Sequence, residues 1–525
     1  MTLDPFTVEV IRHGLTAAAE ELTLTVMRSA RSPLLREAGD MSSALTDAEG
    51  ELIAQGHDIP IHMGVMAQTV KAFLKLVPAE RLAPGDVWVL NLPSVGGNHL
   101  PDVKALRPVF AEGRLFAFAV SLAHWPDIGG AWPGSYFAQA RDTWQEGLRI
   151  PPVRFFTADG PDREKLDFLL ANVRAPEERE GDIMAQMAGT RAADRRILEL
   201  CAEHGPETVA AAMRRLHELS EAGMREAILS IPDGHYAGED FIDDGGPDGG
   251  PAGVRVDIEI AGDTASFDFS RSDDAVDSYL NTTPYVASAA VFYAIKAFAA
   301  PDIQPNGGCY KPLTILTRPG SLLDPGPERP VVGGNHETSQ RIVDAIMRAF
   351  ADTLPERLTA GGPTTAGGLI LAGRNQDGVY RVFFELHGGG EGARIDRDGM
   401  PCVRVHLVNT ANTPAEVVEA EYAIRVEEQS LRRGSGGTGA HRGGDGLARA
   451  YRILAPEMTL TTVFERRVVP PYGLEGGEAG EPFRVTVERA DGEREELPGK
   501  ANLTVHEGDM VLVESCGGGG YGTPA

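Results

Sequence analysis

The sequence predicts a multi-domain α+β protein with mixed helices and antiparallel sheets, many glycine-rich loops and a β-rich C-terminal part. A chain of 525 residues is too long for one small core, and its 62 glycines and 36 prolines indicate many turns. Helical and alternating hydrophobic patterns are interleaved before Gly361, whereas alternating patterns dominate beyond it. We expect an N-terminal α+β domain with a metal site (1–230), a central α+β domain (231–360) and a β-rich C-terminal domain (361–525).

The chain begins with a helix signal. Asp4 and Pro5 are typical of an N-cap and a first turn, and apolar residues then recur at helical spacing until Ser32 and Pro33. The other elements expected before residue 230 are a hairpin over 41–55, an amphipathic helix over 66–74, a short strand over 87–91 and helices over 182–201 and 207–228.

Beyond residue 230 the pattern changes at Pro232, Asp233 and Gly234. Alternation from Val254 to Ile260 predicts a strand with one wet face, paired with 265–269 across a turn. The later predictions are buried helices over 284–300 and 341–354 and strands over 379–386, 403–408 and 417–426.

A long hairpin between residues 105 and 123 predicts how the most distinctive loop meets its neighbour. Two apolar strands flank the two-residue turn Glu112-Gly113. Regular pairing across that turn places His124 opposite Pro101, next to Asp102. Because strands of this length often contain a bulge, and Pro108 suggests one, we expect this register to hold within a residue or two.

That hairpin brings His99 and Asp102 of the loop 96–102 close to His124. Imidazole and carboxylate ligands suit zinc, iron or manganese, and three protein ligands leave a position open for water or substrate. The alternative is a hydrogen-bonded His/Asp pair that only holds the loop. Two further residues are weaker candidates: His62 before a helix, as a cleft or capping residue, and Asp40 at a strand start, as a ligand or turn residue.

Composition excludes several functions. There are 49 basic and 76 acidic residues, and a net charge of −27 disfavours nucleic acid and anionic membrane partners. The four cysteines are far apart and form no C-x-x-C, which favours a cytoplasmic location. No P-loop, H-E-x-x-H or G-x-S-x-G motif occurs, so ATP binding through a P-loop is not expected.

Several strings resemble the B-type subunits of the hydantoinase/oxoprolinase family, which is related to acetone and acetophenone carboxylase subunits. The similarity spans nearly the whole chain. The matching strings are 40–42, 59–64, 96–102, 146–152 (EGLRIPP), 333–344 (GGNHETSQRIVD), 387–394 (HGGGEGAR), 409–421, 435–446 and 470–477.

The resemblance implies an ATP-dependent ring-opening enzyme for cyclic amides such as lactams, hydantoins or oxoproline. A partner of the hydantoinase A type, similar to actin-like ATPases, would bind ATP and phosphorylate the substrate, and this chain would supply metal-activated water. The metal, with zinc favoured over manganese or iron, would be held by residues matching Asp40, His99, Asp102 and His124.

In this scheme Asp127 or His62 would accept the water proton or orient the substrate. The sequence departs from many relatives at Trp125-Pro126, beside the metal residues, so a familiar substrate is not assumed. Two alternatives remain: a component of an ATP-dependent ketone carboxylase, and a structural partner with a non-catalytic metal site.

Overall fold

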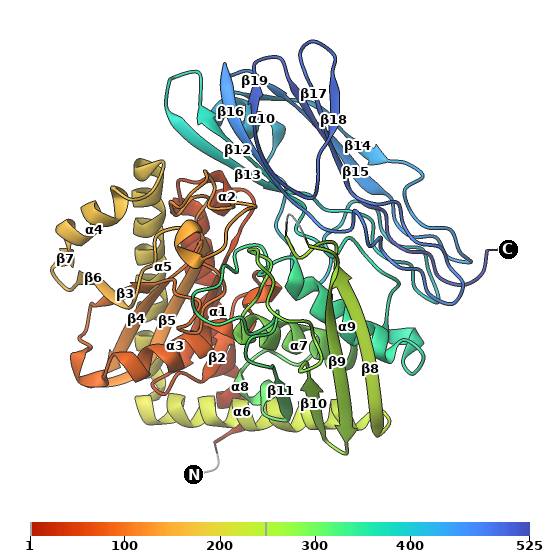
Figure 1. Cartoon of the computed structure of the whole chain (residues 1–525). Helices are drawn as coiled ribbons and strands as arrows, with labels where there is room; N and C mark the ends of the chain where they lie inside the picture. The colour runs from red at the N-terminus through yellow and green to blue at the C-terminus, as the bar shows by residue number, and fades with distance from the viewer. Residues whose placement is uncertain (1–2, 247–248, 525) are drawn as a thin grey trace.

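A computed structural model describes residues 3–246 and 249–524 of the chain. Its N-terminal part contains a seven-stranded antiparallel sheet with the strand order β2-β1-β5-β4-β3-β6-β7 (Figure 1). The strands are β1 (Met41–Asp47), β2 (Leu52–Gln55), β3 (Val87–Leu90), β4 (Asp102–Ala111), β5 (Arg114–His124), β6 (Val153–Thr157) and β7 (Gly160–Pro161).

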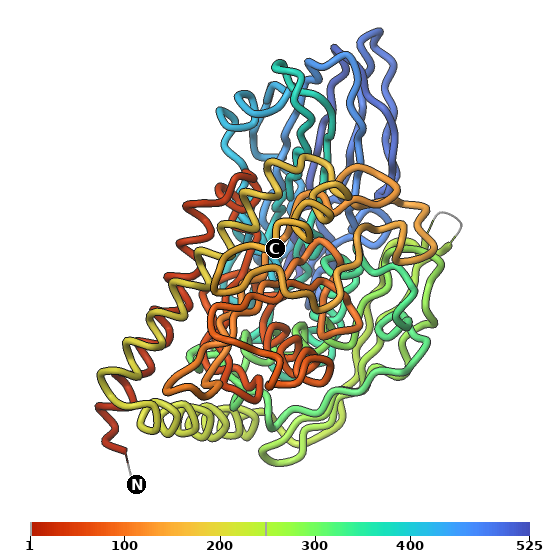
Figure 2. The backbone as a smooth tube through the Cα atoms, turned by 90° about the vertical axis from the view of Figure 1, so that its left-hand side faces the viewer, coloured from red at the N-terminus to blue at the C-terminus, as the bar shows by residue number. Residues whose placement is uncertain are grey.

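Helices cover both faces of this sheet. Helices α1 (Pro5–Ser29) and α5 (Pro176–His204) run side by side and share one apolar cluster with β4 and β5 (Figure 2). Helix α3 (Val65–Leu76) packs on the other face. The predicted cap of α1 is confirmed, because the Asp4 side chain accepts a hydrogen bond from Thr7 N–H. The shorter helices here are α2 (Pro33–Arg36), α4 (Arg163–Leu170), η1 (Pro60–His62), η2 (Ala79–Arg81) and η3 (Thr143–Gln145).

The central part follows α6 (Pro206–Leu229), which runs along one end of the molecule (Figure 1). Its four-stranded sheet has the order β11-β10-β9-β8, and only the β10/β11 pair within this sheet is parallel. Buried helices α7 (Pro284–Ala299) and α9 (Thr338–Phe350) lie close to the two predicted ranges, α9 beginning three residues earlier. The other elements are β8 (Gly234–Ile242), β9 (Ala252–Ala261), β10 (Thr264–Asp268), α8 (Gly307–Tyr310), β11 (Leu313–Leu316) and η4 (Pro355–Arg357).

The C-terminal part contains two further sheets, with the orders β13-β12-β16-β19 and β14-β15-β20-β17-β18, and stands above the other two parts in Figure 1. The strands are β12 (Gly368–Arg374), β13 (Tyr380–Leu386), β14 (Ile424–Arg432), β15 (Gly446–Ile453), β16 (Glu457–Val463), β17 (Arg484–Glu488), β18 (Arg494–Glu496), β19 (Lys500–His506) and β20 (Met510–Glu514).

Two predicted strands in this part are wrong. Residues 403–408 form no strand, because only Val403 makes a bridge and His406 has a positive φ of 55° that interrupts extended backbone. The range 417–426 begins in helix α10 (Ala415–Glu421) and ends in β14 (Ile424–Arg432). Alternating and helical apolar patterns are hard to separate over so few residues.

The predicted α+β class is confirmed, while the three-domain division stays a prediction. One hydrophobic cluster includes Ile59, Val254, Ile346 and Phe384, which belong to all three predicted domains. The three parts therefore share a core, and a site can be built from all of them. Within the described ranges, every helix is too short or too polar to cross a bilayer.

Candidate metal centre

Two strand ends place the first ligand candidates. In the hairpin of β4 and β5, Asp102 pairs directly with His124. Regular pairing would put Pro101 there, and the shift of one residue, which is within the expected range, comes from a bulge between Val109 and Phe110, close to the bulge expected at Pro108. The turn itself is as predicted: Glu112 and Gly113 both have positive φ, as a type I′ turn requires.

Asp40 enters from the next strand. Met41 opens β1 and pairs with Ala123, and the Asp40 carbonyl accepts a hydrogen bond of 3.0 Å from His124 N–H. Asp40 is therefore held beside His124 by regular sheet pairing. Its carboxylate is also buried.

His99 comes from the glycine loop between β3 and β4. Gly96 has a φ of +67°, and a Cβ there would lie 2.5 Å from the backbone of Thr69, so the loop can pack this closely only with glycine. The His99 Nδ1 atom lies 2.9 Å from the Val332 carbonyl oxygen, which places Val332 as the acceptor of an Nδ1–H. In that tautomer Nε2 is left with a free lone pair.

These side chains converge. His99 Nε2 lies 3.1 Å and His124 Nδ1 3.3 Å from the same oxygen, Asp102 Oδ1. One ligand atom from each of the three residues lies within 4.8 Å of the others. His99, Asp102 and His124 are all buried.

The residues fit a cation. His99 Nε2, His124 Nε2 and both Asp102 oxygens are buried and have no hydrogen-bond partner among the described residues, since the short approaches lack hydrogen-bond geometry. Buried polar groups are normally paired, so such unpaired atoms require an explanation. A divalent metal that accepts nitrogen and oxygen ligands would supply the missing partner.

The electrostatics of His99 and Asp102 agree with this donor set, whereas Asp40 and Asp102 raise the pKa of His124 despite its burial. Burial lowers the pKa of His99 to about 4, which favours the neutral ring that a metal requires. Burial opposes ionisation of Asp102, but the nearby His99 and His62 hold its pKa well below the usual range. Burial raises the pKa of Asp40, only partly offset by His124.

His62 lies beside the cluster and Asp127 does not. His62 Nε2 is 3.4 Å from Asp102 Oδ2, and its Nδ1 is 2.8 Å from the Ser42 hydroxyl. The Asp127 carboxylate accepts hydrogen bonds from Gly129, Gly134 and Arg174, two of them from Arg174. It orders the loop that leads to Tyr136.

A cavity of about 30 Å³ adjoins Asp40, His62, Asp102 and His124. This volume is enough for about two waters. All three parts of the chain contribute to its walls. The remaining lining residues are Ile59, Ile61, Tyr136, Asn335, His336, Ala366, Phe384, Leu386, Val408 and Thr410.

Sequence reasoning missed two of these wall residues. The Tyr136 hydroxyl lies 2.8 Å from His336 Nε2, and His336 Nδ1 lies 3.0 Å from Glu337 Oε1. His336 and Glu337 belong to the string 333–344 that carried the resemblance, which was the available signal. Tyr136 is 200 residues away from His336 in sequence and has no such signal.

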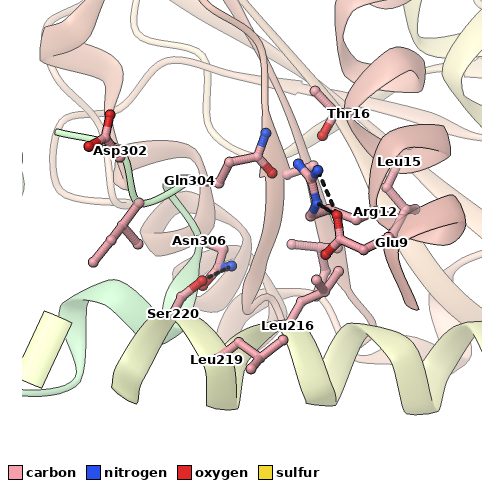
Figure 3. A pocket seen from close by; sticks show the side chains of 13 residues that line it. Glu9, Arg12, Leu15, Thr16, Leu216, Leu219, Ser220, Asp302, Gln304 and Asn306 are labelled. Atoms are coloured by element: carbon pink, nitrogen blue, oxygen red, sulfur yellow. Dashed lines mark hydrogen bonds and ion pairs between the residues drawn. The ribbon is translucent and has the colours of Figure 1, made fainter. Parts of the chain in front are cut away.

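A larger surface pocket of about 320 Å³ lies elsewhere, between α1, α6 and the segment 302–306 (Figure 3). None of the predicted site residues lines it. Its Arg12 pairs with Glu9, and Asn306 with Ser220 (Figure 3). This pocket therefore offers no comparable set of unpaired ligands among the described residues.

Comparisons with known proteins point to one family. The family model described as Hydantoinase B/oxoprolinase matches residues 4–524. The chain is 32% identical to the beta component of caprolactamase from Pseudomonas jessenii over 535 residues, covering all of this chain and 91% of that protein. It is 31% identical to 5-oxoprolinase 1 of Arabidopsis thaliana, covering 99% of this chain but only 42% of that longer protein.

Solved structures show the same fold. The crystal structure of ATP-dependent caprolactamase from Pseudomonas jessenii matches with a TM-score of 0.93 at 29% identity, covering 100% of this chain and 92% of that one. A nucleotide-free acetone carboxylase matches with a TM-score of 0.91 at 19% identity, covering 99% and 76%. The second likeness concerns the fold alone.

Proposed function

This chain belongs to the hydantoinase B/oxoprolinase family, and on that premise we propose that it is the hydrolytic B-type subunit of an ATP-dependent enzyme that opens a cyclic amide. The observation that carries the proposal is the buried His99, Asp102 and His124 cluster with unpaired ligand atoms beside a small cavity. Its relatives include proteins named caprolactamase and 5-oxoprolinase.

His99, Asp102 and His124 would hold one divalent ion, with Asp40 as the fourth ligand. Zinc suits this donor set best, with manganese and iron as alternatives. When bound, such an ion lowers the pKa of a coordinated water and so supplies a nucleophile near neutral pH.

A partner of the hydantoinase A type would supply the ATP site. An amide carbonyl is a poor electrophile, and phosphorylation of its oxygen by the partner would activate the carbon for attack. One relative is named as the beta component of a caprolactamase and another as the B component of a D-/L-hydantoinase, and both names support an assembly of two kinds of chain. The predicted cytoplasmic location is part of this proposal.

Two residues were candidates to accept the proton of the attacking water. We assign that role to His62, which lines the cavity and lies next to Asp102. Asp127 does not line the cavity, and its carboxylate oxygens already accept four hydrogen bonds. The cavity has room for only about two waters, so a cyclic amide can bind there only if wall residues such as Phe384 and Leu386 move apart.

The test uses the chain reconstituted with its A-type partner and a panel of lactams, hydantoins and 5-oxoproline. We expect ATP-dependent ring opening that is lost in His99→Ala and Asp102→Ala, together with bound metal. Ring opening that persists in metal-depleted variants would overturn the mechanism.

The same experiment separates the alternatives. Activity with a ketone that requires bicarbonate and incorporates its carbon would favour the carboxylase alternative. A wild-type chain that binds no divalent metal, while the complex still opens rings, would favour a structural role for this chain.

A further inference from the structure

The segment before α9 holds His99 in place, although Val332 and His99 lie 233 residues apart in sequence. The His99 Nδ1 contact with the Val332 carbonyl, at 2.9 Å, is the contact that sets the ring's tautomer. The direction of the ring therefore depends on where the Val332 peptide sits.

Glu146 fixes that peptide. Its Oε1 atom accepts hydrogen bonds from both Val331 N–H, at 2.7 Å, and Val332 N–H, at 2.6 Å. A second link ties the same two segments, since Thr143 N–H donates to the Glu328 carbonyl at 3.0 Å. Val332 is thus hydrogen-bonded through its N–H to Glu146 and through its C=O to His99.

The environment of Glu146 is unusual for a purely structural residue. The side chain is fully buried, and its Oε2 atom has no hydrogen-bond partner in the described chain. No ion pair of Glu146 is found among the described residues, and burial raises its pKa to about 8. A buried carboxyl with an unpaired oxygen is costly for stability, so a positioning role is the more economical explanation.

We infer that Glu146 is a positioning residue for the metal centre: it holds the Val332 carbonyl that orients His99 Nε2 toward Asp102. This inference rests on the proposed metal site and extends it to a residue that touches neither metal nor substrate. Partners of this kind typically change metal affinity about 10–100-fold when removed.

The test measures zinc affinity of the purified full chain by competition with a chromophoric chelator, without substrate or partner. In Glu146→Leu the two N–H groups lose their acceptor, and we expect zinc affinity to fall about 10–100-fold. Glu146→Gln keeps a carbonyl oxygen at the same place and should bind zinc with nearly the affinity of the wild type. The visible spectrum of the cobalt-loaded protein should change in Glu146→Leu and not in Glu146→Gln.

Asp243 provides a matched control. It is also buried and accepts two backbone hydrogen bonds, from Arg467 N–H and Val469 N–H, both at 2.8 Å. Asp243→Leu should lower thermal stability while leaving zinc affinity nearly unchanged. If Glu146→Leu does not fold, Glu146→Asp, which retracts the oxygen by one methylene, should still weaken zinc binding.

Failure of the proposed function and failure of the role of Glu146 give different results. A wild-type chain that binds no zinc, cobalt or manganese would remove the proposed function itself. Three results would overturn only the role of Glu146, given a wild type that binds metal. They are an unchanged zinc affinity in a folded Glu146→Leu, an equal loss of zinc affinity in Asp243→Leu, and an unchanged zinc affinity in Glu146→Asp where Glu146→Leu fails to fold.

Discussion

Two buried polar clusters in this molecule differ in how their charges are matched. Arg341, Arg466, Asp240 and Asp344 are all fully buried, and each carboxylate pairs with both guanidinium groups. In the candidate metal centre, neither Asp40 nor Asp102 pairs with an arginine or lysine among the described residues, and several ligand atoms have no partner. The first cluster balances its buried carboxylates with arginines, although Arg341 Nε and Asp344 Oδ1 have no hydrogen-bond partner. The second contains two buried carboxylates that no arginine or lysine of the described residues balances.

Burial of charge alone therefore does not mark a functional site. The arginine and aspartate cluster joins β8, α9 and the segment after β16, so it ties the central and C-terminal parts together. Breaking it should affect folding, whereas changes in the metal centre should affect metal binding and activity.

Breaking the arginine and aspartate cluster should lower stability more than any other change considered below. Arg466→Leu leaves two buried carboxylates with one guanidinium less, and we expect the free energy of unfolding to fall by about 3–5 kcal/mol. Urea unfolding of the metal-free chain measures this. The neighbouring Arg467→Leu removes only a partly exposed pair with Glu496 and should cost less than about 1 kcal/mol. Equal losses in the two variants would contradict the distinction.

Zinc binding at the candidate metal centre should have the next largest effect on stability. Free zinc at about 100 times Kd should stabilise the wild-type chain by about 2.7 kcal/mol, because it binds only the folded state. Asp102→Asn should gain nothing at the same zinc concentration, and Asp127→Asn should gain as much as wild type. A thermal melt with and without zinc decides, and an equal shift in Asp102→Asn would refute the ligand assignment.

The third prediction concerns His387, a buried histidine outside the candidate metal centre. Both ring nitrogens of His387 have partners, Gly367 O and Tyr451 OH, and burial lowers its pKa to about 3. The pKa of His387 in the folded state lies below the unfolded value of about 6.5, so between these values the proton binds only to the unfolded chain. The contribution of the neutral His387 to the free energy of unfolding is therefore complete above about pH 6.5 and is lost as pH falls toward about 3. Between about pH 6.5 and 5 the loss should be about 2 kcal/mol.

The measurement is urea unfolding of wild type and His387→Gln across that pH range. The difference in pH dependence between the two proteins isolates this histidine from the carboxylates. Parallel curves would show that His387 is not held neutral.

The smallest expected effect concerns the orientation of His62. Ser42→Ala removes the hydroxyl at 2.8 Å from His62 Nδ1, and a hydrogen bond of this kind contributes about 1 kcal/mol. We expect ring opening by the reconstituted complex to fall about fivefold with zinc content unchanged. Lost zinc would instead place His62 among the ligands.

Local signals in the sequence predicted much of the fold. The cap at Asp4, the turn at Glu112-Gly113 and the alternation of β9 were readable because neighbouring residues determine them. The His124 pairing held within the expected one or two residues; its exact register could not be predicted because the position of the bulge depends on packing along the strand.

The site was predictable only in part for the same reason. His99, Asp102 and His124 lie within or next to one hairpin, so spacing could bring them together, while Asp40 required the resemblance. Tyr136, His336 and the contact between His99 and Val332 depend on how distant segments pack, and no local pattern encodes that.

The walls of the cavity have a practical consequence for engineering. Ala366, Phe384, Leu386, Val408 and Thr410 come from the C-terminal part, whereas the proposed ligands all lie at or before His124. These five wall residues are therefore encoded in a stretch of the gene that contains none of the proposed ligands. A library that randomises these five codons can search for new substrates while every ligand codon stays untouched.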